Sequence, residues 1–268
     1  MSEEKNQMSF LAHLEELRWH LVRSTVSIFI FGIVLFSFKK KVYDNFLLAH
    51  LDSNFVTYQW FCRVFKSIGI DSDFCGVSFP QKLQSLSMTN QLMNAIWTSL
   101  ILGLIISFPY ILWEMWKFIS PGLHKNEVKK SKGFLFIASV LFFTGVLFSF
   151  YVIVPMSVYF FYNFEITDTI QNNFTLSSYI SMVTNTILGV SVVFELPVLI
   201  FFLTKLGLVT PEFLKKYRKH ALVVVLLLSA VITPPDIASQ IIVSIPVLIL
   251  YEISIHVSRF VIKKQEHS

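Results

Sequence analysis

Charge is scarce in this sequence: Asp, Glu, Lys and Arg make up 15% of the 268 residues, whereas hydrophobic residues make up 54%. A water-soluble domain normally carries more charge than this on its surface. Here uncharged runs of about twenty residues recur along the chain, and that is the length that crosses a bilayer. The composition therefore excludes a soluble domain and predicts one polytopic membrane domain over residues 1–268.

Enzyme signatures are also missing. We find no Ser or Cys nucleophile in a glycine-rich elbow, no helical His-Glu-x-x-His and no Gly-Lys-Ser/Thr phosphate loop. Glu252 and His256 form an isolated i, i+4 pair, which fits a membrane interface better than a metal site. The sequence predicts no catalytic residue, no metal and no cofactor, so we do not expect an enzyme.

Cysteine is rare, and both copies, Cys62 and Cys75, lie in one polar segment. Their spacing is not that of a zinc site. A disulfide is expected if the segment faces an oxidising compartment, and two free thiols if it does not. The sequence leaves these alternatives open.

Six apolar segments predict an all-α membrane protein with six transmembrane helices, of which the last two are short. The third and fourth segments contain Pro155 and Pro197, and the second contains Pro109. The fifth segment, of about thirteen residues, rises only about 20 Å, so the last pair forms either a re-entrant hairpin or two short spans. Either way both termini lie on one side. The expected segments are 21–38, 95–116, 133–161, 176–206, 221–233 and 237–251, and residues 42–90 form a long extramembrane loop.

Lysine and arginine gather on the side that holds both termini, and the opposite loops at 162–175 and 234–236 contain none. The positive-inside rule makes the Lys/Arg-rich side cytoplasmic. Three lysines at 39–41, after the first span, contradict the rule locally but are outnumbered. Topology therefore explains the net charge of +5 better than binding to nucleic acid does.

Two carboxylates are expected at the cytoplasmic surface. Residues 9–21 have the periodicity of an amphipathic helix that lies along the membrane and leads into the first span. Glu16 is on its polar face, where Arg23 and neighbouring histidines balance it. Glu127 lies among lysines in the loop after the second span. From the pattern alone, either carboxylate could simply be solvated.

Glu195 and Asp236 belong to the spans themselves. An ionisable group inside a span costs several kcal/mol and marks a candidate functional site, although Glu195 could instead form a structural hydrogen bond to Ser191, to Thr186 or to another helix. Asp236 follows Pro234 and Pro235 at the start of the last segment, where helix N-capping is the simplest explanation.

Five motifs in the same order resemble the TatC family of twin-arginine translocase receptors, and together they cover nearly the whole chain. They are HLEELR at 13–18, WKFISPGL at 116–123 with Glu127 four residues on, FELP at 194–197, TPPD at 233–236 with Ser239 and Gln240, and Glu252 ahead of SRF at 258–260.

The resemblance implies a concave, glove-like six-helix bundle in the bacterial inner membrane, with both termini cytoplasmic. Such proteins bind twin-arginine signal peptides and export folded precursor proteins, driven by the proton gradient, together with single-span TatA-type or TatB-type partners in a homo- or hetero-oligomer. By position, Glu16 and Glu127 match the carboxylates that receive the arginine pair. Arg18 and Phe118 match residues that surround these carboxylates in the family, and Glu195 matches the polar residue of the fourth span.

Some features depart from the family. The loop at 42–90 is longer than in familiar members, residues 47–51 lack the usual proline, and Asn90 or Gln91 replaces an acidic residue before the second span. The alternative function is a secondary transporter or channel for a small solute or ion, because broken helices and a buried glutamate also suit that class. We see no inverted repeat that would favour it, and no paired nucleophile and base for an intramembrane protease.

Overall fold

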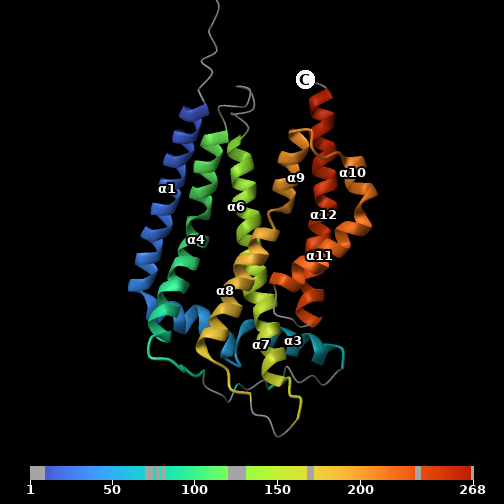
Figure 1. Ribbon diagram of the computed structural model, residues 1–268. Helices are drawn as coiled ribbons and strands as arrows, with labels where there is room; N and C mark the ends of the chain where they lie inside the picture. Colours follow the sequence, from blue (N-terminus) through green and yellow to red (C-terminus); the bar gives the residue numbers. More distant parts are fainter. Residues whose placement is uncertain are drawn as a thin grey trace, which may run out of the picture. The chain divides into compact units, whose positions relative to one another are not determined.

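The structure is a computed structural model that describes residues 10–69, 75–76, 79, 83–119, 131–167, 172–232 and 237–266. Within these ranges the chain is helical apart from short connections and one isolated bridge between Gln84 and Thr175. Five helices are long and apolar enough to cross a membrane (Figure 1). These spans are Leu14–Ser37, Asn90–Phe118, Leu135–Asn163, Leu176–Lys205 and Gln240–Lys263.

The first span belongs to a single helix, α1 (Phe10–Ser37). Residues 9–21 are expected to form an amphipathic helix along the membrane surface that leads into the first span; of these, residues 10–21 are the first turns of α1. No glycine or proline lies between Phe10 and Phe31 of α1, so nothing in its sequence ends the helix before the apolar run begins. The second span is α4 (Asn90–Ile119), which passes through Pro109 without ending.

Two of the spans are irregular near a proline. The third span consists of α6 (Ser131–Phe148), a π-helical turn η4 (Ser149–Ile153) and α7 (Val154–Asn163), with Pro155 at the start of α7. The fourth is divided into α8 (Leu176–Val193) and α9 (Leu196–Lys205) just before Pro197. Because proline lacks an amide hydrogen, the helical bonding must be rearranged at both places.

The last pair of helices is unequal. As expected, α11 (Arg218–Ile232) is short, and it follows the small helix α10 (Pro211–Lys216). By contrast, α12 (Ile237–Glu266) is 30 residues long, so the expectation of two short final helices holds only for α11. The charged residues beyond 251 lower the hydropathy but do not end the helix. Glu252 accepts a hydrogen bond from Arg218 at 2.7 Å, and the ring of His256 bonds the carbonyl of Glu252.

The segment between the first two spans is partly helical. It contains α2 (Lys39–Val42), a π-helical turn η1 (Tyr43–Leu47), a 3₁₀ turn η2 (Leu48–Leu51) and α3 (Val56–Ser67). Cys62 and Cys75 form a disulfide, which settles the alternative that the sequence left open.

The chain has two compact units, residues 1–39 with 95–139, and residues 40–94 with 140–268. In the first unit, α1 and α4 approach closely at two glycines. A Cβ atom on Gly103 would lie 2.8 Å from the nitrogen of Gly32 and 2.8 Å from the carbonyl oxygen of Ile28. Only glycine therefore permits this backbone contact, which is a common way for helices to pack in lipid.

The second unit has an apolar core between η4, α8, α11 and α12. Polar side chains add specific contacts at its edges: Thr204 of α9 donates to Ser258 of α12, and Gln240 of α12 donates to the carbonyl of Leu226 in α11. The buried members of the core are Ile153, Val190, Val193, Phe194, Val225, Val243 and Val247.

In the same unit, His50 joins η2 to the third span. It is fully buried, with Nε2 2.9 Å from the carbonyl oxygen of Phe150 and Nδ1 3.3 Å from that of Leu47. The hydroxyl of Tyr58 donates to the carbonyl of His50, and that of Tyr179 donates to the carbonyl of Leu47. Burial lowers the pKa of His50 to about 4, although both carbonyl contacts raise it.

This pKa predicts that acid destabilises the fold. The pKa of His50 is lower in the folded protein than in the unfolded chain. The contribution of His50 to the free energy of unfolding is therefore complete above about pH 6.5, and it falls by up to about 3 kcal/mol as the pH drops toward 4. Unfolding midpoints of the detergent-solubilised protein should therefore fall less between pH 7.5 and 4.5 in His50→Gln than in the wild type. The control is His256→Gln at an exposed histidine, which should follow the wild type. Equal acid sensitivity in His50→Gln and the wild type would contradict the prediction.

Candidate functional site

A buried carboxylate lies between α1 and α4 in the first unit. Glu114 is 1% exposed. Its Oε2 is 2.6 Å from Nδ1 of the buried His20 and 3.9 Å from the Arg23 guanidinium, and its Oε1 accepts a hydrogen bond from Lys117 at 3.0 Å. A buried charge survives only when it is paired and hydrogen-bonded. Lys117 and Arg23 therefore balance the charge of Glu114 from within the protein, and His20 is its closest partner.

Aromatic rings surround this cluster. The Lys117 ammonium lies 3.4 Å from the centre of the Trp113 ring, a cation–π contact. The ring of Phe118 meets that of His20 edge to face, with 6.3 Å between centroids. Phe118, which the resemblance assigned to the signal-peptide site, is thus held at the end of α4 beside the Glu114 cluster.

Glu16 lies one helical turn before His20, on the same side of α1. Its Oε2 is buried, and it has no hydrogen-bond partner in the part of the chain that the structure describes. An unpaired buried carboxylate oxygen carries a desolvation cost that a bound donor would recover. The two carboxylates therefore differ, since Glu114 is already neutralised and Glu16 can still accept a donor.

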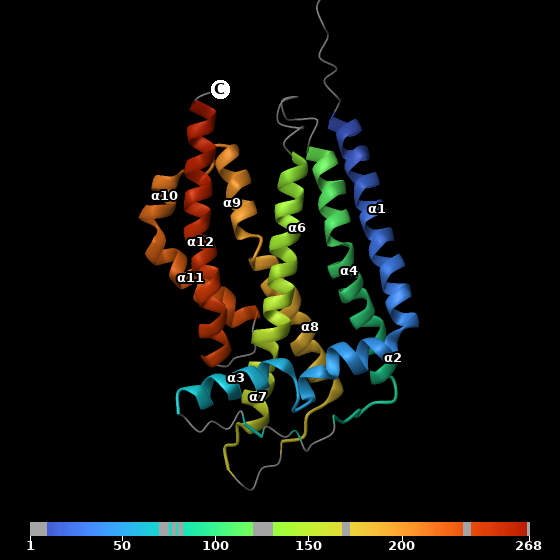
Figure 2. The ribbon, with the colours of Figure 1, turned by 180° about the vertical axis from the view of Figure 1, so that it is seen from behind.

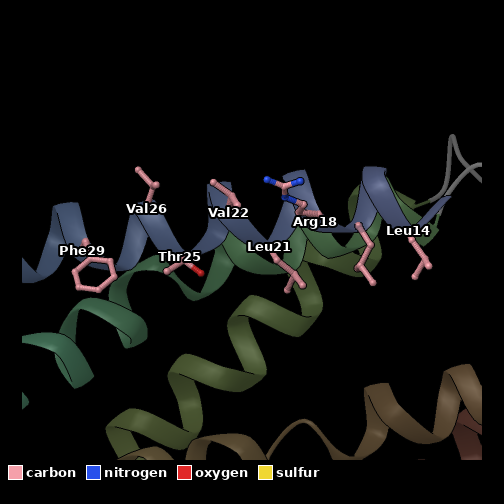
Figure 3. A pocket seen from close by; sticks show the side chains of 8 residues that line it. Leu14, Arg18, Leu21, Val22, Thr25, Val26 and Phe29 are labelled. Atoms are coloured by element: carbon pink, nitrogen blue, oxygen red, sulfur yellow. The ribbon is translucent and has the colours of Figure 1, made fainter. Parts of the chain in front are cut away.

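Arg18 lies on another face of α1. It is exposed and lines an open, mostly apolar groove of about 500 Å³ (Figure 3). Figure 3 shows its guanidinium directed away from the helix axis. Within the part of the chain that the structure describes, Arg18 forms no ion pair with Glu16 and is near it only in sequence. The other residues of the groove are Leu14, Leu17, Leu21, Val22, Thr25, Val26 and Phe29.

Glu195 occupies the junction between α8 and α9 in the second unit. Both of its carboxylate oxygens are buried, and neither accepts a hydrogen bond of normal geometry within the described residues. The side chain faces the backbone of α6 at Phe142. Ser191, which we considered as its partner, donates to the carbonyl of Ile187 in its own helix. The structural hydrogen bond offered as the simpler explanation is thus not formed with Ser191.

Four predicted site residues, Glu127, Pro234, Pro235 and Asp236, lie outside the described residues. The structure therefore brings Phe118 together with the Glu114 cluster on α1 and α4, and it leaves the proposed pairing of Glu16 with Glu127 as a prediction.

Sequence reasoning missed Glu114 and His20. The signal was available, because Glu114 is an ionisable residue inside the second apolar segment, and the rule that singled out Glu195 applies to it equally. His20 is less visible, since its position suits the polar face of an amphipathic helix as well as a buried pair.

Long apolar helices that carry a few buried carboxylates define a multi-pass membrane protein, and among the described residues no group of His, Cys, Asp and Glu is arranged to hold a metal. The family model for the Sec-independent protein translocase protein (TatC) matches residues 12–246. This chain belongs to the TatC family.

Individual relatives agree over nearly the full length. The Sec-independent protein translocase protein TatC of Blattabacterium sp. subsp. Periplaneta americana is 41% identical and is matched over 99% of this chain and 100% of its own. The TatC of Helicobacter pylori strain J99 is 36% identical over 93% of this chain and 88% of its own. A crystal structure of the twin arginine translocase receptor TatC superposes with a TM-score of 0.67 and 29% identity, over 93% of this chain and 99% of that one.

Proposed function

We propose that this protein is the signal-peptide receptor of a twin-arginine translocase and that Glu16 and Glu127 receive the two arginines of the peptide. The observation that carries the proposal is the contrast within the first unit. Glu114 is paired with His20, Lys117 and Arg23, whereas a buried oxygen of Glu16 has no hydrogen-bond partner among the described residues. Arginine is suited to such an oxygen, because its planar fork donates two parallel hydrogen bonds to a carboxylate.

The surroundings support an arginine ligand. Phe118, at the end of α4, offers an aromatic ring for a guanidinium or for the peptide. The Glu114 cluster fixes α1 against α4 and so keeps Glu16 and Phe118 in fixed positions relative to each other. Family membership makes the protein a translocase subunit and not an enzyme, and it sets aside the transporter or channel alternative.

The direct test is photocrosslinking in membranes of a precursor with a twin-arginine signal, compared with the same precursor carrying Lys-Lys. Crosslinking should be strong with the arginine pair and should fall sharply with the lysine pair, because a lysine ammonium cannot reproduce the bidentate bond. Equal crosslinking of the two precursors would contradict the proposed receptor function.

The proposed orientation places both termini in the cytoplasm of a bacterium, with the chain in its inner membrane and residues 42–90, 162–175 and 234–236 outside. The distribution of Lys and Arg favours it. The Cys62–Cys75 disulfide also favours it, since disulfides persist in oxidising compartments such as the periplasm. The two native cysteines are in the disulfide, so a Ser268→Cys variant carries one reactive thiol. Labelling of that thiol by an impermeant reagent in intact cells would show that the orientation is the opposite of the one proposed.

Glu195 is proposed to contact single-span partners of the TatA or TatB type. A carboxylate buried without a partner gains most from a polar group on a helix that packs against it. Glu195→Ala should therefore weaken crosslinking to such a span while leaving precursor crosslinking intact. Glu165→Ala, at an exposed carboxylate after α7, is the control and should change neither. Normal partner crosslinking and transport in Glu195→Ala would reduce this residue to a structural role.

A further inference from the structure

The helix α3 (Val56–Ser67) packs on the third span through one face only. Thr57 donates to the carbonyl of Tyr151, and the Tyr58 hydroxyl donates to that of Pro155 at 3.1 Å. Both side chains are buried. In both views α3 runs across the direction of α7 and α12, the helices of its own unit (Figures 1 and 2).

The exposed face of α3 is divided lengthwise. Val56, Trp60 and Val64 follow one another at four-residue spacing and so form one stripe, which Ile68 continues just past the helix end. The exposed fractions are 63% for Val56, 54% for Trp60 and 65% for Ile68. The exposed side chains of Val56, Trp60 and Ile68, with the half-buried Val64 between them, form a stripe that is typical of a helix lying on a bilayer.

The adjoining stripe is polar and cationic. Gln59, Arg63 and Lys66 are exposed and lie beside the apolar stripe, and the sequence of α3 contains no acidic residue. Tryptophan and basic residues are favoured where the hydrocarbon meets the phosphate headgroups. The two stripes therefore match the two sides of that boundary.

The depth of α3 agrees with this boundary. The third span begins at Leu135. At 1.5 Å per residue, Tyr151 lies about 24 Å and Pro155 about 30 Å along it. The hydrocarbon core is about 30 Å thick. Because α3 bonds to both carbonyls, it meets the third span about one hydrocarbon thickness beyond the start of that span.

A polar pocket of about 570 Å³ opens beside α3. Arg63 supplies a cation, and Asn54 and Gln59 supply amide donors, while the Cys62–Cys75 disulfide forms part of the wall. The remaining lining residues are Ser53 and Gly76, so none of the seven is acidic. Such a lining suits an anionic group, and at this depth that group is a lipid phosphate.

We propose that α3 lies in the headgroup layer on the side of residues 42–90, with Trp60 among the upper acyl chains and a phospholipid headgroup in the Arg63 pocket. This site is independent of signal-peptide binding. It requires only that the chain spans the membrane.

Trp60 itself reports the first part of the proposal. The full-length protein is reconstituted into vesicles of phosphatidylcholine and phosphatidylglycerol that contain phospholipids brominated either near the headgroup or near the methyl end. The contribution of Trp60 is the fluorescence of the wild type minus that of Trp60→Phe. It should be quenched most by bromine near the headgroup and little by aqueous iodide. Strong iodide quenching would place Trp60 in water, and protection from both quenchers would mean that protein covers it; either result overturns the proposal.

A matched variant tests the sidedness of the helix. In the Trp60→Phe background, Lys66→Trp places the indole on the polar stripe of the same helix. Its contribution, measured against Trp60→Phe alone, should be quenched by iodide much more than that of Trp60. Identical quenching at the two positions would contradict an interfacial orientation.

The pocket is tested with spin-labelled phosphatidylglycerol in the same vesicles, by the fraction of label that the protein immobilises. Arg63→Gln should lower this fraction. Lys66→Gln, which removes the same charge three residues away but does not line the pocket, should lower it less. Equal effects of the two variants would indicate a general attraction between charges and not a specific site. If Arg63→Gln had no effect, the proposed headgroup site would be contradicted.

Discussion

Replacing Glu16 with Gln should weaken binding of a twin-arginine signal peptide by about ten-fold to a hundred-fold. Charge-assisted hydrogen bonds of this kind contribute on the order of 1.5 to 3 kcal/mol, which corresponds to that range of affinity. Gln keeps the size of the side chain and one acceptor oxygen, so the loss reports the charge and the second hydrogen bond. Crosslinking of the precursor to membranes, titrated against precursor concentration, measures it.

Glu127→Gln should show a similar loss if adjacent arginines are received by the two carboxylates. The neighbouring lysines Lys125, Lys129 and Lys130 oppose a basic peptide unless they turn toward lipid headgroups, so the effect at Glu127 is the more demanding test. Glu15→Gln is the matched control, since this exposed neighbour of Glu16 faces elsewhere on α1. Wild-type crosslinking by the Gln variants at 16 and 127 would show that the site has been placed wrongly.

Replacing His20 with Phe should lower the free energy of unfolding by about 2 to 4 kcal/mol. The substitution keeps a ring of similar shape but removes the closest partner of a carboxylate that is 1% exposed. Breaking a buried pair by removing one member is strongly destabilising, because the other charge remains buried. The unfolding midpoint in detergent measures the loss, and His256→Phe, at an exposed histidine on α12, should be nearly neutral.

The second half of this experiment is a rescue. Adding Glu114→Met to His20→Phe removes the buried carboxylate, while Lys117 and Arg23 can turn toward water because both side chains are partly exposed. The double variant should therefore recover most of the lost stability. If it is no more stable than His20→Phe alone, then the ring of His20 acts through packing and not through its pair with Glu114.

The sequence predicted the helices well, because apolar length is nearly sufficient to define a span in lipid. The turns near Pro155 and the break before Pro197 followed from the chemistry of proline. The length of α12 did not follow, since charged residues beyond 251 lower the hydropathy without ending a helix. The structure within residues 42–90 was also missed, because short helices held by contacts such as those of His50 leave no periodic signal.

For the site, the motif resemblance selected Glu16, Arg18, Phe118 and Glu195 by position, but position does not reveal partners. Whether a carboxylate is neutralised depends on residues far away in the sequence, as Glu114 shows: His20 is 94 residues from it. The distinction between a satisfied carboxylate and one with an unpaired oxygen therefore required coordinates.

The unbroken course of α1 sets the height at which a peptide would be received. Between Glu16 and Ser37 the helix rises about 32 Å, close to the thickness of the hydrocarbon layer. Glu16 accordingly stands at the level of the phosphates when Ser37 stands at the opposite edge. Arginines that reach this height stay among headgroups and water, and they avoid the cost of entering hydrocarbon, while an apolar stretch that follows them is already at the depth of the acyl chains.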